Sequence, residues 1–355
     1  MKKFFVILIT LMMVVVLVSA CKTDEQAESE EPPAEEEEVK EEAVVEEEEE
    51  PAEPTEIFTL KIGNVLADDD PITIGLRKMA ENVAARTNGG IVIDVYPSSQ
   101  LGDTPDILEM AKTGSNVGVI IDTGLLADYV PDIAIYSAPY VFDNVEEARA
   151  FIETDIFKGW VEELATFGMR NLSHNWYQGA RHFLTNKLVE TPADLVNLRV
   201  RTMGSAVAQE TMSSLGAIPT SVAWGEVYSA IQSKVIDACE AQLPAVYGQS
   251  LYEVISNIAE TGHFLLYTGL VISEEWFQQL PDEYKQILTE ESIANGDYAT
   301  ELTIGKEVEY KAEMEDKGVL FTAVDITPFK EATAAVYEIM EWADLKAQID
   351  TALGK

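Results

Sequence analysis

Few side chains in this sequence have the types and spacing that covalent or metal chemistry needs. The three histidines, His174, His182 and His263, are widely spaced and there are only two cysteines, so a zinc site built from such ligands is not expected. The motifs G-x-G-x-x-G, G-x-x-x-x-G-K-[ST], G-x-S-x-G and H-E-x-x-H do not occur. Asp122 with Glu240 is the one pair that could be proposed as a general acid and base, and the sequence gives no geometry for it. We therefore predict a binding function, with no catalytic residue, no metal and no cofactor.

Acidic residues dominate the composition. The 355 residues include 63 aspartates and glutamates against 24 lysines and arginines, which gives a formal net charge of -39. Such a protein cannot neutralise a phosphate backbone, so a nucleic-acid partner is not expected. The length predicts two or three folded units, each large enough for a hydrophobic core.

The first 56 residues have the pattern of an export signal followed by a spacer. Two lysines precede the apolar run Phe4–Val18, which is shorter than a transmembrane helix, and Leu-Val-Ser-Ala-Cys21 resembles a bacterial lipobox. Residues 22–56 hold 18 acidic residues, two lysines, four prolines and no aromatic residue, a composition typical of a disordered linker. We expect residues 1–21 to be a lipoprotein signal peptide. Lipid on Cys21 then anchors the protein to a membrane of the cell envelope, facing the periplasm or the outside.

Hydrophobic patterns after residue 57 alternate between strands and helices. The alternation over Phe58–Val65 predicts a strand, and the amphipathic stretch Ile72–Ala85 predicts a helix. Further strands are predicted over Ile91–Tyr96, Val117–Ile121, Gly168–Asn175, Leu198–Arg201 and Val235–Glu240, and helices over Asp106–Lys112, Ala206–Leu215 and within Ser273–Met314. Two α/β units, with the long C-terminal helices packed across or along both, are the simplest account. A ligand would then lie in the cleft between the units.

Seven short segments occur in an order and spacing typical of one family. They are Tyr96-Pro-Ser-Ser-Gln-Leu-Gly102, Ala138-Pro-Tyr-Val141, Gly179-Ala-Arg-His182, Asp194-Leu-x-x-Leu-Arg-Val-Arg201, Leu215-Gly-Ala-x-Pro-Thr220, Glu226-Val-Tyr-x-Ala-Ile-Gln232 and Asp237-x-x-Glu240. Together they resemble the solute-binding proteins of tripartite ATP-independent periplasmic (TRAP) transporters, DctP family, from roughly Leu60 to the C-terminus.

The resemblance implies an α/β, two-lobed fold like that of periplasmic binding proteins, with a ligand cleft between the lobes and long C-terminal helices bridging them. Residues 57–178 with about 267–306 would form one lobe, and residues 179–266 with about 307–355 the other. It implies a small organic anion, namely a carboxylate, as the ligand and integral membrane permease subunits as partners. It also allows for a homodimer.

Two arginines are the principal site residues that the resemblance implies. Arg201 ends the Arg-Val-Arg strand, where the family holds the ligand carboxylate. A guanidinium is a planar fork that matches a carboxylate with two hydrogen bonds, which a lysine cannot do. Arg181 either contacts the ligand as well or braces the hinge between the lobes.

The remaining candidates each have a structural alternative. Trp224 either packs on the ligand or belongs to the core. Asp122 follows the strand Val117–Ile121, at the strand end where open α/β sheets bind ligands, and otherwise caps a loop. Asn64 is either a similar contact or a turn residue. Glu226 matches the family pattern but also suits the first turn of a helix.

One segment departs from the family pattern. Carboxylate-binding members have D-G-x-E-N-P where this chain has Asp237-Ala-Cys-Glu240-Ala241-Gln242, so Glu240 is retained and Ala241 replaces an asparagine whose amide often bonds the ligand. One neutral hydrogen bond contributes roughly 0.5 to 1.5 kcal/mol, so Arg201 alone could still hold an acid. Ala241 and Cys239 together predict a more apolar pocket, and a more apolar ligand is the alternative that this suggests. An unpaired Arg201 would be costly in such a pocket.

An exported enzyme on the same scaffold is the other alternative.

Overall fold

The structure is a computed structural model that describes residues 56–355. The predictions for the signal peptide, for Cys21 and for the linker as far as residue 55 lie outside the described residues. No helix within residues 56–355 combines the length and the apolar character that a membrane span requires.

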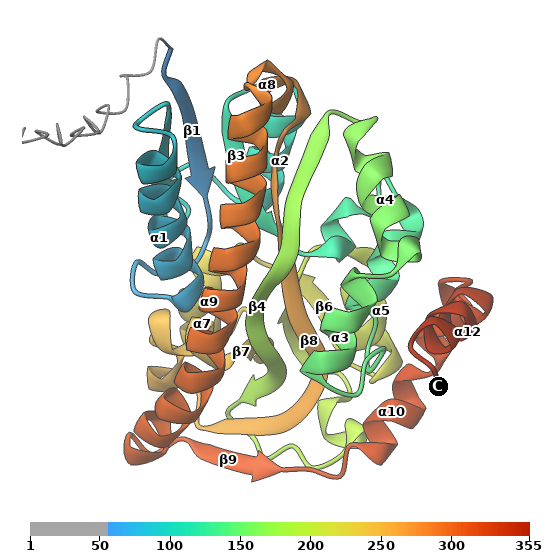
Figure 1. Cartoon of the computed structure of the whole chain (residues 1–355). Helices are drawn as coiled ribbons and strands as arrows, with labels where there is room; N and C mark the ends of the chain where they lie inside the picture. Colours follow the sequence, from blue (N-terminus) through green and yellow to red (C-terminus); the bar gives the residue numbers. More distant parts are fainter. Residues whose placement is uncertain (1–55) are drawn as a thin grey trace, which may run out of the picture. The chain divides into compact units, whose positions relative to one another are not determined.

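One mixed sheet of nine strands forms the centre of the described part of the chain (Figure 1). The strands are β1 (Phe58–Gly63), β2 (Ile91–Tyr96), β3 (Val117–Ile121), β4 (Met169–Thr185), β5 (Arg199–Thr202), β6 (Ile218–Ser221), β7 (Ala238–Gln242), β8 (Asn257–Ser273) and β9 (Leu320–Ala323). Their order is β2-β1-β3-β8-β4-β7-β5-β6, with β9 paired to β8. The neighbours of β1 and of β5 are parallel to them, whereas β4 and β8 run antiparallel to each other.

The two longest strands join the two ends of this sheet. β4 and β8 have 17 residues each. β3 pairs with the C-terminal part of β8, and β7 pairs with the C-terminal part of β4. Because β4 and β8 are antiparallel, β3 and β7 lie toward opposite ends of the long pair. We call the β2-β1-β3 end the first half-sheet and the β7-β5-β6 end the second half-sheet.

Several strand predictions are confirmed, but not the two long strands. β2 and β3 have the predicted bounds, and β1 and β5 differ from the prediction by one or two residues. β4 continues to Thr185, beyond the predicted end at Asn175, and β8 has no predicted counterpart. The two expected α/β units are therefore joined by one sheet, in which two strands pass from one half to the other.

Helices cover both faces of the sheet, and local sequence signals set where several of them begin. They are α1 (Pro71–Arg86), α2 (Thr104–Lys112), α3 (Val145–Ile152), α4 (Asp155–Ala165), α5 (Ala206–Ser214), α6 (Val227–Gln232), α7 (Leu243–Gly248), α8 (Glu274–Gln279), α9 (Asp282–Asp316), α10 (Thr327–Thr333), α11 (Ala335–Ile339) and α12 (Ala343–Ala352). The Asp70 carboxylate accepts from the Ile72 amide at 2.9 Å and begins α1. The Ser273 hydroxyl accepts from the Trp276 amide at 3.2 Å, so the predicted start of a helix at Ser273 is confirmed.

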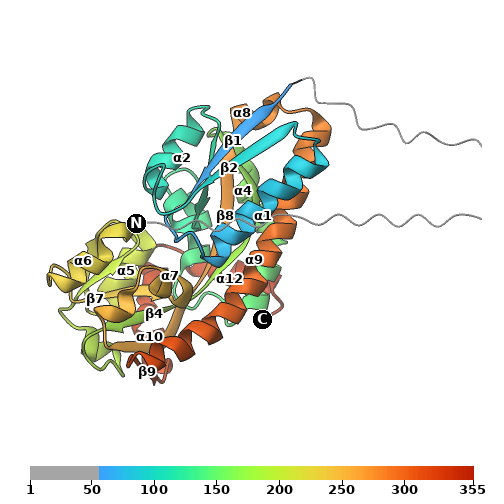
Figure 2. The same cartoon turned by 90° about the vertical axis from the view of Figure 1, so that its left-hand side faces the viewer.

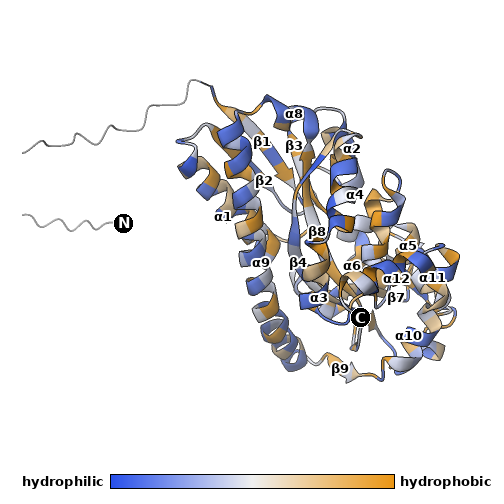
Figure 3. Cartoon of the chain, turned by 45° about the vertical axis from the view of Figure 1, so that its right-hand side comes forward, coloured by the Kyte–Doolittle hydropathy of each residue, from blue (hydrophilic) through white to orange (hydrophobic). Residues whose placement is uncertain are grey.

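Helix α9 runs alongside both half-sheets (Figure 2). It has 35 residues and packs against α1, β4 and α7. Its buried face is unusually polar and includes Glu291, Ser292, Asn295, Thr300 and Thr303, and hydrophilic residues are spread over much of its length (Figure 3). The prediction of a long C-terminal helix along both units is confirmed. The helix has no continuous apolar stripe, so the sequence pattern could not indicate which of its faces is buried.

The last helices of the chain contact both ends of the sheet. Helices α10 and α11 pack against α5, which follows β5 in the second half-sheet. The Lys355 ammonium lies 3.0 Å from the Asp143 carboxylate, and Trp342 and Ile349 join the hydrophobic cluster around Tyr136. The C-terminal residues therefore also link the second half-sheet to the segment before α3.

Candidate ligand-binding pocket

A pocket of about 360 Å³ lies where the two half-sheets face each other. Asn64 follows β1, Asp122 follows β3, and Arg201 lies near the end of β5. The pocket is thus built at the carboxyl ends of parallel strands, where open α/β sheets bind ligands. Its other walls come from residues 65, 66, 103–106, 120 and 125 on the first side, residues 203, 204, 221–224 and 242 on the second, and residues 178, 181, 266 and 268 of the two long strands.

The Arg201 guanidinium is held in this pocket without a carboxylate partner among the described residues. Its side chain is buried, with 8% of the residue exposed, and its Nε donates to the Val222 carbonyl at 3.0 Å. The guanidinium carbon lies 5.2 Å from the centre of the Trp224 ring. Burial, together with the positive charge of Arg181, lowers the pKa of Arg201 to about 10, so the group remains charged at neutral pH. The Arg201 guanidinium is therefore positioned by one hydrogen bond and by the face of the Trp224 ring. Its two terminal nitrogens donate to no protein group within residues 56–355.

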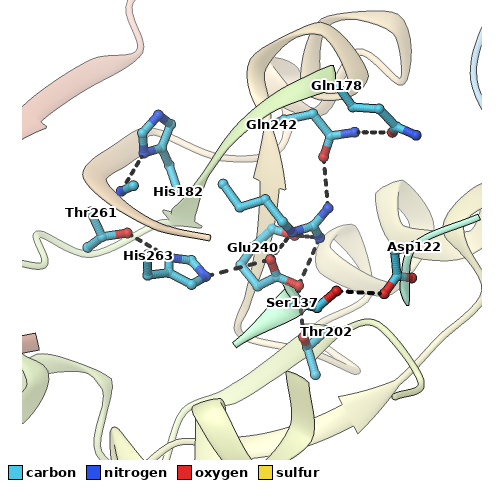
Figure 4. A network of polar contacts seen from close by, with 11 residues as sticks. Asp122, Ser137, Gln178, His182, Thr202, Glu240, Gln242, Thr261 and His263 are labelled. Carbon is cyan, nitrogen blue, oxygen red and sulfur yellow. Dashed lines mark hydrogen bonds and ion pairs between the residues drawn. The ribbon is translucent and has the colours of Figure 1, made fainter. Parts of the chain in front are cut away.

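Arg181, in contrast, is already paired with a carboxylate of the protein. It forms a buried ion pair with Glu240 and also donates to the Glu240 carbonyl at 2.6 Å and to the Gln242 amide oxygen at 2.8 Å. Burial opposes ionisation of Glu240, but the Arg181 charge and the hydrogen bonds prevail and lower its pKa to about 2. The Thr202 hydroxyl donates to Glu240 at 2.8 Å, and the His263 ring nitrogen lies 3.7 Å away (Figure 4). Of the two alternatives for Arg181, the contacts favour a brace at the edge of the pocket.

Asp122 and Asn64 line the wall that belongs to the first half-sheet. The Asp122 carboxylate accepts from the Gly124 amide at 2.8 Å and from the Ser137 hydroxyl at 3.4 Å, so it caps its loop and also lines the pocket. Burial raises the pKa of Asp122 to about 6. The Asn64 side-chain oxygen accepts from the Leu66 amide at 2.9 Å, while its buried amide nitrogen has no partner among the described residues.

Three candidates from the sequence do not line the pocket. Ala241 packs in the hydrophobic core and Glu240 lies behind Arg181, while Glu226 ends a short helical turn beside Trp224. Neighbouring residues of a strand point to opposite faces, so β7 presents Gln242 to the pocket and turns Ala241 away. The expectation that Ala241 makes the pocket more apolar is therefore corrected. Glu240 is paired with Arg181. It is therefore not available to act with Asp122 as a general acid and base.

The sequence analysis missed several pocket residues. They include the carboxylates Asp103 and Asp106 and the amides Gln242 and Gln178. The Gln242 amide nitrogen donates to the Gln178 side-chain oxygen at 3.0 Å. The alternation along Ala238–Gln242 could have identified Gln242, because Glu240 and Gln242 must share a face. Gln178 and Thr268 are on the long strands, whose central parts were not predicted.

The polar groups around the pocket do not form a metal centre. Within residues 56–355, no three histidine, cysteine, aspartate or glutamate side chains gather as ligands. One free guanidinium, one aromatic face and several hydrogen-bonding groups suit the reversible binding of a small polar molecule.

Comparison with known proteins agrees with this geometry. The family model described as "Bacterial extracellular solute-binding protein, family 7", DctP, matches residues 62–343. The chain belongs to this family. It is a solute-binding protein of the TRAP transporter type, and its family consists of extracellular binding proteins rather than enzymes.

Solved structures and a characterised relative support this assignment. A TRAP periplasmic solute-binding protein from Escherichia fergusonii, in an apo open form, is 40% identical and has a TM-score of 0.74, over 83% of this chain and 99% of that one. One from Ochrobacterium anthropi, with bound L-fuconate, is 30% identical with a TM-score of 0.81, over 84% and 99%. The sialic acid-binding periplasmic protein of Vibrio cholerae is 28% identical over 281 residues, which are 79% of this chain and 87% of that protein.

Proposed function

We propose that this solute-binding protein holds a small organic acid through a two-pronged contact between the ligand carboxylate and Arg201. The observation that carries the proposal is a buried, charged guanidinium that lines the pocket and has no carboxylate partner among the described residues. A buried charge without a counter-charge is costly, and a ligand carboxylate removes this cost. The Trp224 ring limits the directions from which the carboxylate can approach.

The opposite wall favours a ligand with one carboxylate and several hydroxyl groups. Arg181 is already neutralised by Glu240, so the pocket offers one free guanidinium rather than two. A second ligand carboxylate would face Asp122, whereas hydroxyl groups can donate to Asp122 and accept from the free Asn64 amide. Support comes from the Ochrobacterium structure with L-fuconate, a hydroxylated monocarboxylic acid. A more apolar ligand is not favoured, because Gln242 and Gln178 occupy the wall where Ala241 was expected.

Three compounds with the same carbon skeleton test this proposal by calorimetric titration. Galactitol has no carboxylate, L-galactonate has one and galactarate has two. We expect L-galactonate to bind, galactitol to bind at least tenfold more weakly because charge-assisted hydrogen bonds are lost, and galactarate to be disfavoured by Asp122. Equal affinities for galactitol and L-galactonate would contradict a carboxylate anchor. Tighter binding of galactarate would contradict the role given to Asp122.

We further propose that the two lobes move about the middle of the long strands. The expected boundary at residues 178/179 coincides with a register shift between Tyr177 and Gly179, and Gly179 has a φ of 124°. The lobes would then comprise residues 57–178 with about 267–306, and 179–266 with about 307–355. A ligand that contacts both walls favours the closed form. The lower TM-score to the open Escherichia structure, despite its higher identity, supports a closed arrangement here.

A close approach beside the pocket provides a prediction about closure. A Cβ atom on Gly124, beside β3, would lie 2.7 Å from the hydroxyl oxygen of Ser205, which precedes α5 on the other side, and 2.8 Å from the Oδ1 atom of Asp122. We expect Gly124→Ala to raise the dissociation constant of an acid ligand about tenfold, since overpacking costs about 1 to 3 kcal/mol. Gly225→Ala is the matched control, because a Cβ there meets nothing within 4 Å. Calorimetry should show no change for the control, and an equal effect of both variants would argue against closure at this contact.

We also propose that the protein is tethered by lipid on Cys21, through the acidic linker of residues 22–56, and delivers its ligand to integral membrane permease subunits. The lipobox-like sequence before Cys21 supports the tether. The permease partner and a homodimer are proposed from the family alone.

Replacing the anchor residue tests the tether. We expect Cys21→Ser to move the protein from the membrane fraction to the soluble fraction. The substitution removes the residue that carries the acyl chains, and stable anchoring needs several of them. Immunoblots of separated fractions from the native host measure this distribution. Ser19→Thr is a control that keeps the cysteine, and retention of Cys21→Ser in the membrane fraction would contradict the lipid anchor.

A further inference from the structure

A second cavity, separate from the ligand pocket, lies between α3, α4, the beginning of β4 and α9. Its volume is about 310 Å³, and it shares no lining residue with the first pocket. Figure 1 shows α4 and α9 on either side of the first part of β4. The lining residues are Arg149, Ile152, Glu153, Phe157, Lys158, Val161, Glu162, Asn171, Leu172, Ser173, His174, Asn175 and Ile293.

An irregular strand forms one wall of this cavity. The register of β4 against β8 shifts between Asn171 and Ser173 and again between Ser173 and Trp176. Five consecutive residues, 171–175, therefore line the cavity, whereas a regular strand would present only alternate residues. Such irregularities often redirect side chains next to functional sites.

Three side chains on this wall, those of His174, Asn171 and Asn175, have buried polar atoms without hydrogen-bond partners among the described residues. His174 is 3% exposed, and neither of its ring nitrogens finds a hydrogen-bond partner among the described residues. The side-chain oxygen of Asn171, a residue that is 9% exposed, also has none. Leaving a buried polar group unpaired costs about 1 to 3 kcal/mol, so these atoms favour a bound group that can donate and accept hydrogen bonds.

The other walls indicate the character of that group. Phe157, Val161 and Ile293 provide an apolar surface, and the His174 ring lies 5.0 Å from the Phe157 ring. Burial lowers the pKa of His174 to about 3, so its imidazole is neutral and offers one donor and one acceptor.

Both cations at the rim of this cavity are already paired with carboxylates. Arg149 donates to the Asp297 carboxylate at 2.9 Å, and the Lys158 ammonium lies 3.0 Å from the Glu153 carboxylate. Glu162 is a further carboxylate among the lining residues, so with Asp297 the rim has two cations and three anions. Nothing in this balance attracts an anionic ligand, in contrast to the pocket around Arg201.

We propose that this cavity is a second binding site, for a small neutral aromatic or alicyclic alcohol. Its ring packs against Phe157, Val161 and Ile293, and its hydroxyl group hydrogen-bonds with His174 and Asn171. The site is independent of the proposed carboxylate site, so either can fail without the other.

Phenol, with toluene as its counterpart without a hydroxyl group, tests the proposal by saturation-transfer NMR on the full-length protein. We expect saturable binding of phenol with a dissociation constant of about 1 mM or tighter. Ile293→Trp, at the rim of the cavity, should abolish it. Ile304→Trp is the matched control, because both isoleucines lie on α9 with 45% and 46% exposure and only Ile293 lines the cavity. Arg201→Ala should leave phenol binding unchanged.

His174→Phe isolates the hydrogen bond. The wild type should prefer phenol to toluene by a few-fold to about tenfold, and the variant should lose this preference while still binding both. The proposal is overturned if phenol shows no saturable binding, if Ile293→Trp and Ile304→Trp behave alike, or if Arg201→Ala removes binding. An unchanged preference in His174→Phe would also overturn the assigned role of the imidazole.

Discussion

Replacing Arg201 with alanine is expected to weaken the binding of an acid such as L-galactonate by at least about thirtyfold. The guanidinium is buried and has no carboxylate partner among the described residues, so a bound carboxylate would lose its only counter-charge in this pocket. Truncating one partner of a buried, hydrogen-bonded charge pair costs about 2 to 5 kcal/mol. Calorimetric titration of the full-length protein measures the loss directly.

Two further variants separate charge from geometry. Arg201→Lys keeps the positive charge but loses the planar fork and the bond from Nε to the Val222 carbonyl. We expect it to bind more weakly than the wild type by about tenfold or more. Arg199→Ala is the control, because Arg199 lies two residues earlier on β5 and pairs with Asp237 outside the pocket. If Arg201→Ala retained wild-type affinity, the carboxylate anchor would be wrong.

The pocket arginine could be predicted from the sequence, but its surroundings could not. The motif around Arg201 gave its place at the end of a strand, and the chemistry of a guanidinium indicated a carboxylate. That Arg181 is neutralised could not be predicted, because its partner Glu240 is 59 residues away in sequence and reaches it only through the pairing of β4 with β7. A pattern within one strand carries no information on which strand lies beside it.

The fold shows the same limit. Short strands with clear apolar patterns, such as Val117–Ile121, were predicted at their correct bounds. β4 and β8 were not, because both cross the whole sheet and change surroundings along their length, so that buried residues are polar in places and apolar in others. Asn171, His174 and Gln178 are buried on β4 through tertiary contacts that alternation of hydrophobicity does not reveal.

The other large expected effect concerns Glu240. Replacing it with glutamine should leave Arg181 buried without a counter-charge and lower the free energy of unfolding by about 3 to 5 kcal/mol at pH 7. Asp237→Asn is the matched control, because Asp237 also pairs with an arginine through two oxygens but at the surface. Exposed pairs contribute about 1 kcal/mol or less. Urea unfolding of both variants measures the difference.

The dependence on pH distinguishes loss of the ion pair from a packing defect. The pKa of Glu240 is lowered in the folded protein from 4.5 to about 2. Its contribution to stability is therefore complete above pH 4.5 and is lost as the pH falls toward 2. The wild type and Glu240→Gln should thus differ most at neutral pH and converge as the pH falls below 4.5. A difference that stays constant from pH 7 to pH 3 would mean that glutamine disturbs the packing of β7, and that the Arg181 charge does not depend on Glu240 for its burial.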